Sequence, residues 1–356
     1  SEESYGKSLM SDNILGNRFA GYRTGAWHGL GTVFQEALTP REALEIADAD
    51  IEITKQQMVY QYDDAAFLSP RYALVRGPVD DETEPVYLGS ASEEYVVVQN
   101  SDVADILAPI AGEWPVETVG VIRNGATFFM TLDVGRYEVA GEENRQFVLV
   151  HTSHDGTSAL KVEKVSMRVV CENTLVMASR NASESFSLKH VGDVKAQAEW
   201  HVEVMASLRS SLKDMQAEQE RMAETEATDE ITAGIITAAY PTPALPAPAE
   251  ETTKLVNSDQ VSNELASKLI AQQKRREHVY QVELKRAQAL QLSAGQLFVN
   301  DYAATPIAGT AWGVVNAVTE VSNWREGPHA DRSVMFGVRR DEGQRAYAKA
   351  LQYANA

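Results

Sequence analysis

The residues best suited to bind a metal ion lie in one short segment, His151-Thr152-Ser153-His154-Asp155. Two imidazoles and a carboxylate within five residues are chemically able to converge on one cation. On a β-strand, however, His151 and His154 point to opposite faces, and Asp155-Gly156 is typical of a hairpin turn. The pattern therefore favours a turn over a metal site, and we predict neither a metal nor a cofactor.

The most distinctive segment is Arg168-Val169-Val170-Cys171-Glu172-Asn173-Thr174-Leu175. Cys171 would be a nucleophile if a helix N-terminus lowered its pKa, but a buried structural thiol is the commoner role. Arg168, in an otherwise apolar strand, must find a carboxylate, a carbonyl group or a phosphate. Internal pairing is the favoured account of Arg168, and phosphate binding remains the alternative.

The glycine-rich segment Trp27-His28-Gly29-Leu30-Gly31-Thr32 offers backbone donors for an anion, although a tight turn anchored by a buried tryptophan explains it better. The usual nucleotide-binding, hydrolase and zinc-protease motifs are absent from the sequence. We therefore predict a protein that is not an enzyme.

Basic residues interleaved with aromatic ones suggest contact with a nucleic acid. Tyr280, Trp312, Trp324 and Phe336 lie among the arginines and lysines of the C-terminal third. A solvated helix face with core aromatics is the alternative interpretation of this pattern. The candidate nucleic-acid-binding residues are Arg168, Lys274, Arg275, Arg276, Lys285, Arg286, Trp312, Arg332, Arg339 and Arg340.

The formal net charge of the 356-residue chain is −19, which argues against a protein that coats nucleic acid with its whole surface. Most of the acidity lies in residues 1–150, with 10 Lys and Arg against 25 Asp and Glu. Residues 254–291 are locally positive, with 7 basic against 4 acidic side chains. A basic face on an acidic protein is therefore feasible.

The hydrophobic pattern predicts an α+β fold, a mostly antiparallel meander sheet with inserted helices, followed by a long helix and a helical C-terminal third. Thr39-Pro40 and Glu42 begin a capped helix. Strands are expected around 58–60, 72–75, 86–88 and 95–98, and another helix at 102–111. Hairpins are expected at Asn124-Gly125 and Asp155-Gly156. Ser166 to Val170 should be strand, and Asn173 or Thr174 should cap a helix at 175–179.

The chain is expected to divide into a sheet domain at 1–213, an acidic, proline-rich linker or strap at 214–257, and a helical region at 258–356 that packs back on the sheet. Long helices are predicted at about 194–227 and 258–292, with further helices from Gly309 to Trp324 and from Asp341 to Tyr353.

A single cysteine and the lack of an apolar segment of membrane-spanning length favour a soluble protein of a reducing cytoplasm. Neither an export signal nor a membrane partner is predicted.

Several motifs together resemble the phage and plasmid-like protein family known as domain of unknown function 932. They run in order through nearly the whole chain: Thr24-Gly25-Ala26-Trp27-His28-Gly29-Leu30-Gly31, Tyr95-Val96-Val97-Val98-Gln99-Asn100, Ser153-His154-Asp155-Gly156-Thr157, the Arg168 to Leu175 segment, Gly309-Thr310-Ala311-Trp312 and Asn316-Ala317-Val318-Thr319-Glu320. The resemblance implies a phage or plasmid protein that acts in the cytoplasm of a bacterial host, and it supplies no reaction.

Two main functional hypotheses follow from these observations, and an enzyme centred on Cys171, His154 and Asp155 remains open as a third. The first is a nucleic-acid-handling protein that binds or anneals single-stranded DNA in phage recombination or replication. The second is a non-enzymatic protein-binding or homo-oligomeric assembly factor, suggested by the acidity, the prolines and the long helices.

Overall fold

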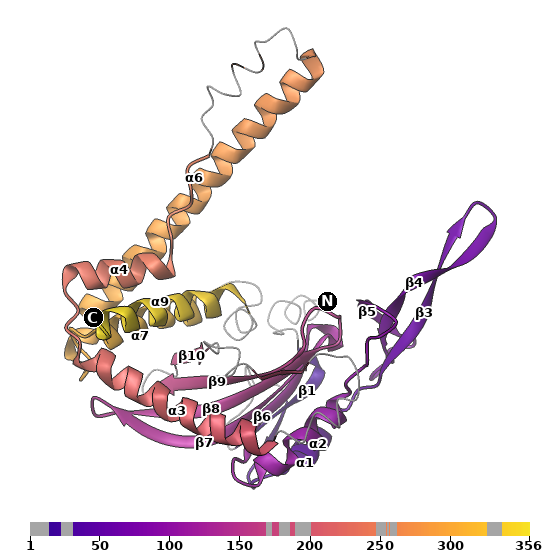
Figure 1. The fold of residues 1–356 in the computed structure, drawn as a ribbon, viewed down its shortest axis with the longest axis horizontal. Coiled ribbons are helices and arrows are strands. Elements are labelled where there is room, and N and C mark those ends of the chain that lie inside the picture. Colours follow the sequence, from indigo (N-terminus) through magenta and orange to yellow (C-terminus); the bar gives the residue numbers. More distant parts are fainter. Residues whose placement is uncertain are drawn as a thin grey trace, which may run out of the picture. The chain divides into compact units, whose positions relative to one another are not determined.

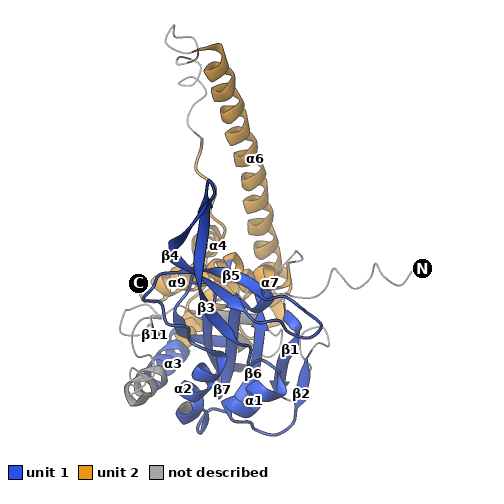
Figure 2. Cartoon of the chain, turned by 90° about the vertical axis from the view of Figure 1, so that its right-hand side faces the viewer, with its two compact units in different colours: residues 1–218, 326–337 blue, residues 219–325, 338–356 orange. Residues whose placement is uncertain are grey.

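The computed structural model describes residues 14–22, 31–168, 173–177, 186–188, 201–246, 254, 256, 262–325 and 337–356. It confirms the α+β class, with a meander sheet, a long helix and a helical C-terminal region (Figure 1). The chain divides into two compact units (Figure 2). Unit 1 comprises residues 1–218 and 326–337, and unit 2 comprises residues 219–325 and 338–356.

Unit 1 is built on an eight-stranded sheet whose central strands form the expected antiparallel meander. In spatial order its strands are β10 (Asn173–Met177), β9 (Leu160–Arg168), β8 (Glu142–Ser153), β7 (Thr127–Val139), β6 (Val116–Ile122), β1 (Ile14–Tyr22) and β2 (Thr32–Phe34), with β11 (Phe186–Leu188) also paired to β9. One buried cluster joins Phe19, Phe129, Phe147 and Leu149 of this sheet. Burial of these large apolar side chains provides the main driving force for folding.

Turn chemistry positions the two central hairpins as the sequence predicts. Asn124 and Gly125 both have positive φ in the short 3-10 turn η2 (Arg123–Gly125) that joins β6 to β7. Gly156 also has positive φ in the connection from β8 to β9. A side chain at Gly125 would collide with the Arg76 side chain, so glycine also permits a close approach there.

Three helices accompany the sheet. Helix α1 (Pro40–Ile46) has the predicted capping box, in which Thr39 and Glu42 bond reciprocally. Helix α2 (Asn100–Ala111) follows the predicted range. Helix α3 (His201–Glu224) lies over β8 and β9, because Gln146 and Lys164 donate to its Leu212 and Ser211 carbonyls.

A second sheet of unit 1 has three strands, β3 (Ile53–Tyr62), β4 (Ala65–Arg76) and β5 (Val86–Ala91), in that order. Strand β5 pairs only with residues 72–76 of β4. The rest of β4 and residues 58–62 of β3 therefore extend beyond β5 as a two-stranded hairpin, visible in Figure 1. We call residues 56–70 of this hairpin the arm.

Unit 2 is helical. It contains α4 (Asp229–Ala239), α6 (Asn263–Asn300), the short 3-10 helix η4 (Tyr302–Ala304), α7 (Ala311–Trp324) and α9 (Val338–Ala354). Trp312 packs edge-on against Tyr347, with ring centroids 6.3 Å apart. The buried Tyr240 hydroxyl bonds to the Val318 carbonyl and to Ser322. No described helix combines the length and apolar character that crossing a membrane requires.

Three local predictions are wrong. Asn173 and Thr174 do not cap a helix, because residues 173–177 pair with β9 as strand β10. Residues 95–98 are not a strand, since they lead into α2, where the Gln99 backbone N–H donates to Asp102. The predicted linker at 214–257 contains the end of α3 and all of α4, and Ile235, Ile236 and Ala239 of α4 are buried in unit 2.

Candidate nucleic-acid interface

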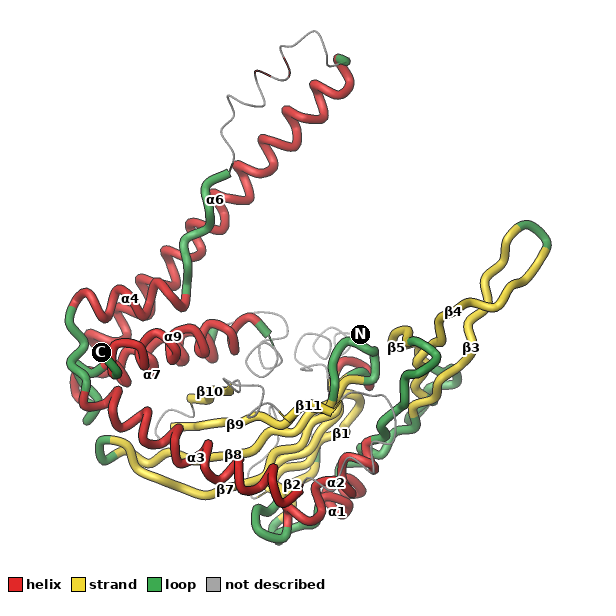
Figure 3. Tube along the Cα trace, viewed as in Figure 1, coloured by secondary structure: helices red, strands yellow, loops and turns green. Residues whose placement is uncertain are grey.

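Helix α6 carries half of the candidate nucleic-acid-binding residues. Its 38 residues make it about 57 Å long at ~1.5 Å per residue, and Ser262 caps its N-terminus. Ala287, Ala294 and Phe298 in its C-terminal half are buried. The N-terminal half extends beyond α4, α7 and α9 (Figure 3). Unit 2 thus presents several turns of α6 without cover from its other described helices.

The exposed part of α6 is basic. The helix has six Lys and Arg side chains against three Glu, a net charge of +3 in a chain of net charge −19. All five candidates on it are exposed, and none has an ion-pair partner within the described residues. They are Lys274, Arg275, Arg276, Lys285 and Arg286. Exposed cations without an ion-pair partner among the described residues are available for a phosphate.

The helical period gathers part of this set into a stripe. Arg275, Val279, Val282 and Arg286 follow one another at i, i+4, i+7 and i+11, so they share one face of the helix. Val279 and Val282 are 44% and 53% exposed. The stripe combines two cations with an apolar middle, which suits a ligand that has both charged and apolar surfaces.

A shallow hollow of about 420 Å³ lies beside this stripe. Arg275, Arg276 and Tyr280 line it from α6, and Ala244 and Pro246 line it from the proline-containing segment. Val279, Gln272 and Glu283 complete the lining. The half-buried Tyr280 ring thus lies in the same hollow as two arginines, the combination that binds a phosphate and stacks on an unpaired base.

The C-terminal arginines have other roles. Arg345 donates to the Ala238 and Ala239 carbonyls, at 3.1 Å and 2.6 Å, and so caps the C-terminus of α4. Arg339 is buried and donates to the Asn323 carbonyl near the end of α7. Arg340 is half-buried on α9, and Arg332 lies outside the described residues. The structure thus gives Arg339 a backbone partner inside unit 2, and its contact with a phosphate stays a prediction.

The aromatic candidates also separate. Trp312 is only 3% exposed and packs against Tyr347, so its ring is not available to a base. Trp324 is exposed, whereas Phe336 lies outside the described residues. Tyr280 is therefore the aromatic ring that the structure places beside the α6 cations.

Arg168 is the last residue of β9, and its backbone pairs with Asn144 and Asn173. The Arg168 side chain and the whole of Cys171 lie outside what the structure describes. The segment Trp27 to Leu30 also lies outside it. The hypotheses for these residues therefore stay predictions.

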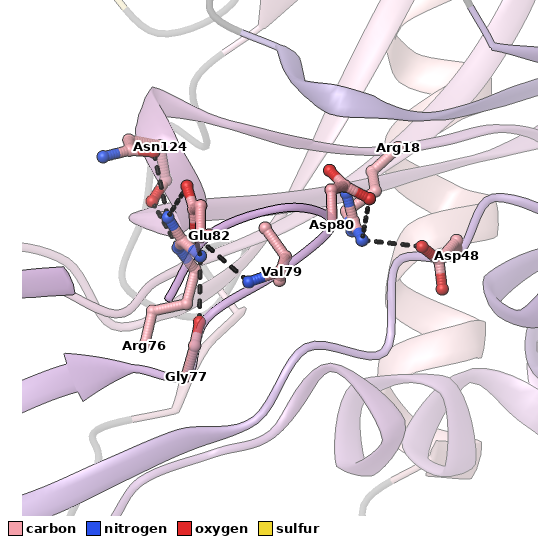
Figure 4. Close-up of polar contacts among 8 residues, drawn as sticks. All are labelled: Arg18, Asp48, Arg76, Gly77, Val79, Asp80, Glu82 and Asn124. Carbon is pink, nitrogen blue, oxygen red and sulfur yellow. Dashed lines mark hydrogen bonds and ion pairs between the residues drawn. The ribbon is translucent and has the colours of Figure 1, made fainter. Parts of the chain in front are cut away.

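Two buried arginines of unit 1 were not singled out from the sequence (Figure 4). Arg76 is fully buried, and it donates to both Glu82 carboxylate oxygens, to the Gly77 and Asn124 carbonyls and to the Asn124 amide oxygen. Arg18 donates to both Asp80 oxygens and lies 2.7 Å from Asp48. The sequence contains a signal for the pairing of Arg76. This arginine ends an apolar strand and is followed closely by the acidic segment 80–82.

Asp80 and Glu82 line an open hollow of about 660 Å³, together with Ile14, Gly16 and Asp81 among others. Hydrogen bonds from Arg76 and from the Val79 backbone lower the pKa of Glu82 to about 2. The hydrogen bond from Arg18 likewise lowers the pKa of Asp80. The carboxylates therefore stay ionised and neutralise the two arginines, which is a structural role.

The histidine segment does not form a metal site in the described part of the chain. His151 lies 2.8 Å from Glu163, and His154 lies 2.7 Å from Asn100. Asp155 pairs with Arg123 and accepts from Thr157. No group of three or more His, Cys, Asp or Glu side chains among the described residues is arranged to hold a metal ion.

The fold and this surface define a two-unit α+β protein with an exposed basic helix. Residues 87–351 match the family model described as Domain of unknown function (DUF932), and the chain belongs to that family. The match begins in β5 and includes α6, whereas the arm and Arg76 precede it. No curated protein and no solved structure matches the chain.

Proposed function

We propose that this chain is a phage- or plasmid-encoded nucleic-acid-handling protein that binds single-stranded DNA through α6 without catalysing a reaction. The observation that carries the proposal is the hollow in which Arg275 and Arg276 lie with Tyr280. Cations there would contact the phosphates, while the tyrosine ring would stack on an unpaired base.

Electrostatics supports a local binding surface. A chain of net charge −19 repels DNA over most of its surface, so a strand would meet favourable potential mainly along the basic part of α6. Single-stranded DNA suits this surface better than duplex, because its bases are free to stack and Val279 and Val282 offer apolar contact. Each phosphate contact releases a counterion, so binding should weaken steeply with salt.

The test is fluorescence anisotropy of the full chain with a labelled oligonucleotide at about 50 mM salt. The double variant Arg275→Gln, Arg276→Gln should bind about tenfold or more weakly than the wild type. The matched control is Lys213→Gln, Arg221→Gln, which removes the same charge from exposed positions on α3. The control should bind like the wild type.

Undetectable binding by the wild type would refute the proposal, as would equal losses in the two double variants. Equal losses would mean that net charge alone governs binding. Tyr280→Leu distinguishes stacking from simple charge attraction, because it removes the ring and leaves every cation in place. It should reduce affinity for oligonucleotides and leave the salt dependence unchanged.

Annealing is the activity that we propose for the bound strand, in phage recombination or replication inside the bacterial host cell. Strand annealing also needs two strands held near each other, which an assembly of several chains would favour.

A second candidate function is therefore assembly itself. The observation that favours it is the exposed arm of unit 1, whose two strand segments, 56–62 and 65–70, carry no charge.

A further inference from the structure

The arm has an unusual composition for so acidic a chain. Residues 56–62, Gln-Gln-Met-Val-Tyr-Gln-Tyr, contain no charge, no proline and no glycine. Residues 65–70 of β4 also carry no charge. Seven-residue segments of high β-propensity and low charge are typical of strands that pair with copies of themselves.

Both faces of the arm are exposed and apolar. Every residue from Val59 to Leu68 is exposed. Tyr60 stacks on Phe67 on one face, with ring centroids 5.6 Å apart, and these rings are 53% and 44% exposed. Val59 is paired with Leu68 on the other face, and these side chains are 57% and 72% exposed. A contiguous apolar surface of this kind marks an interaction site.

The two edges of the arm differ. The β4 edge is protected by Pro70 and by an irregularity in register between Gln57 and Val59, where three residues of β4 oppose one of β3. Among the described residues, the β3 edge has neither a proline nor an extra residue of this kind. Gln99 covers its beginning by bonding to the backbone N–H and carbonyl of Ile53. No described strand pairs with the remaining β3 edge.

Charged residues at the two ends of the uncharged β3 segment indicate which partner strand fits this edge. Lys55 and Asp63 lie four residues before and four residues after Val59. If two β3 strands pair antiparallel about Val59, Lys55 of each copy lies at the end of the ladder, beside the turn of the other copy in which Asp63 and Asp64 follow Tyr62. Parallel pairing would instead place like charges opposite each other, which is unfavourable. Lys55 donates to the Glu93 and Tyr95 carbonyls, and its ammonium group has a third N–H for this contact.

We propose that the arm joins two copies of this chain, with the β3 strands paired antiparallel and Val59 at the twofold axis. Two chains of net charge −19 repel each other over most of their surfaces, so contact through an uncharged segment with complementary ends is favoured. The twofold contact is closed, because each arm uses the same edge. It does not depend on DNA binding by α6.

The first test is cysteine crosslinking in a full-length Cys171→Ser background. Opposite residues of an antiparallel pair have Cβ atoms about 4.5–5.5 Å apart, close to disulfide distance. Val59→Cys should therefore give a covalent dimer on mild oxidation. Leu68→Cys is the matched control, since it is more exposed but lies on the β4 edge. Absence of the Val59 crosslink, or equal crosslinking at both positions, would overturn the proposal.

The second test is sedimentation velocity over a wide dilution series. The wild type should be a dimer that dissociates on dilution. Val59→Lys places two ammonium groups at the axis and should raise the dissociation constant about tenfold or more. Val299→Lys changes an exposed valine of α6 and should leave the dimer intact. A wild type that is monomeric throughout, or a Val59→Lys dimer of unchanged affinity, would refute the arm contact.

Measuring oligonucleotide binding on the same variants separates the two proposals. Val59→Lys should leave intrinsic binding to a short oligonucleotide unchanged, and the Arg275→Gln, Arg276→Gln variant should leave the dimer unchanged. Loss of the dimer in the α6 variant would contradict pairing through the arm. Failure of one proposal is thus visible without failure of the other.

Discussion

Arg76 in unit 1 and Arg275 in unit 2 are the same residue type in opposite environments. Arg76 is fully buried, and a carboxylate, an amide oxygen and two carbonyl groups accept its hydrogen bonds. Arg275 is exposed and has no ion-pair partner within the described residues. The first guanidinium holds distant segments together, whereas the second is free for a ligand. The number of accepting groups around an arginine thus indicates its role better than its position in a basic segment.

The same comparison divides the basic residues of unit 2 into two groups. Arg339 and Arg345 belong with Arg76, because backbone carbonyls accept their hydrogen bonds. The candidates on α6 belong with Arg275. Four predictions follow from this division.

The largest effect is expected at Arg76. Arg76→Ala should reduce the free energy of unfolding of unit 1 by about 3 kcal/mol, since it leaves buried acceptors without donors and opens a void. Hydrogen exchange of the β4 and β6 amides measures this loss. Arg71→Ala, at an exposed arginine of the same strand, should cost less than about 1 kcal/mol. Equal losses in the free energy of unfolding for the two variants would contradict the distinction between buried and exposed arginines.

The α6 cations should affect binding and leave folding unchanged. Arg275→Gln, Arg276→Gln should lower the slope of log affinity against log salt by about 1.4, at ~0.7 for each lost contact with a single-strand phosphate. Its free energy of unfolding should stay within about 0.5 kcal/mol of the wild type. Anisotropy titrations at several salt concentrations and urea unfolding measure the two quantities. A large loss of stability would mean that these arginines have a structural role like that of Arg76.

Arg345 tests the capping role. Arg345→Met keeps the apolar stem of the side chain but removes the hydrogen bonds to Ala238 and Ala239, so unit 2 should lose about 1 kcal/mol. Urea unfolding measures this change. Oligonucleotide affinity should fall by less than in the α6 double variant, and an equal fall would assign Arg345 to the binding surface.

The smallest effect concerns pH. The pKa of Glu82 is about 2 in the folded chain, against an ordinary value of 4.5. Between pH 2 and pH 4.5 the unfolded chain therefore binds a proton at this carboxyl that the folded chain does not bind. The contribution of this pair is present above pH 4.5 and is lost as the pH falls toward 2. Acid unfolding of Glu82→Gln should therefore depend less on pH in this window than that of the wild type. Glu84→Gln is the control, and a variant curve parallel to that of the wild type would contradict the assignment.

Local signals predicted much of the fold. The capping box of Thr39 and Glu42 and the turns at Asn124-Gly125 and Asp155-Gly156 depend on residues that are neighbours in sequence. The long C-terminal helices also appear where the apolar period places them. The exposed cations of α6 were identifiable for the same reason, because a basic segment on one helix needs no distant contact to be recognised.

Predictions that depended on distant contacts were less successful. Residues 173–177 have local features of a capped helix, but hydrogen bonding to β9 makes them a strand. Trp312 lies among basic residues in sequence, but contact with Tyr347 buries it. Residues 229–239 look like part of an acidic linker, whereas packing of Ile235 and Ile236 makes them part of the core of unit 2.

The sequence by itself determined the α+β class, the turns, the helix caps and the basic character of α6. Only the tertiary structure decided which arginines are free, because a guanidinium finds its acceptors across the fold, as Arg76 does with Asn124 and Arg345 with Ala239. It also decided that the arm extends beyond β5, since strand pairing stops at Tyr72. Local propensity acts between neighbours, whereas burial and hydrogen-bond satisfaction depend on contacts between residues far apart in the chain.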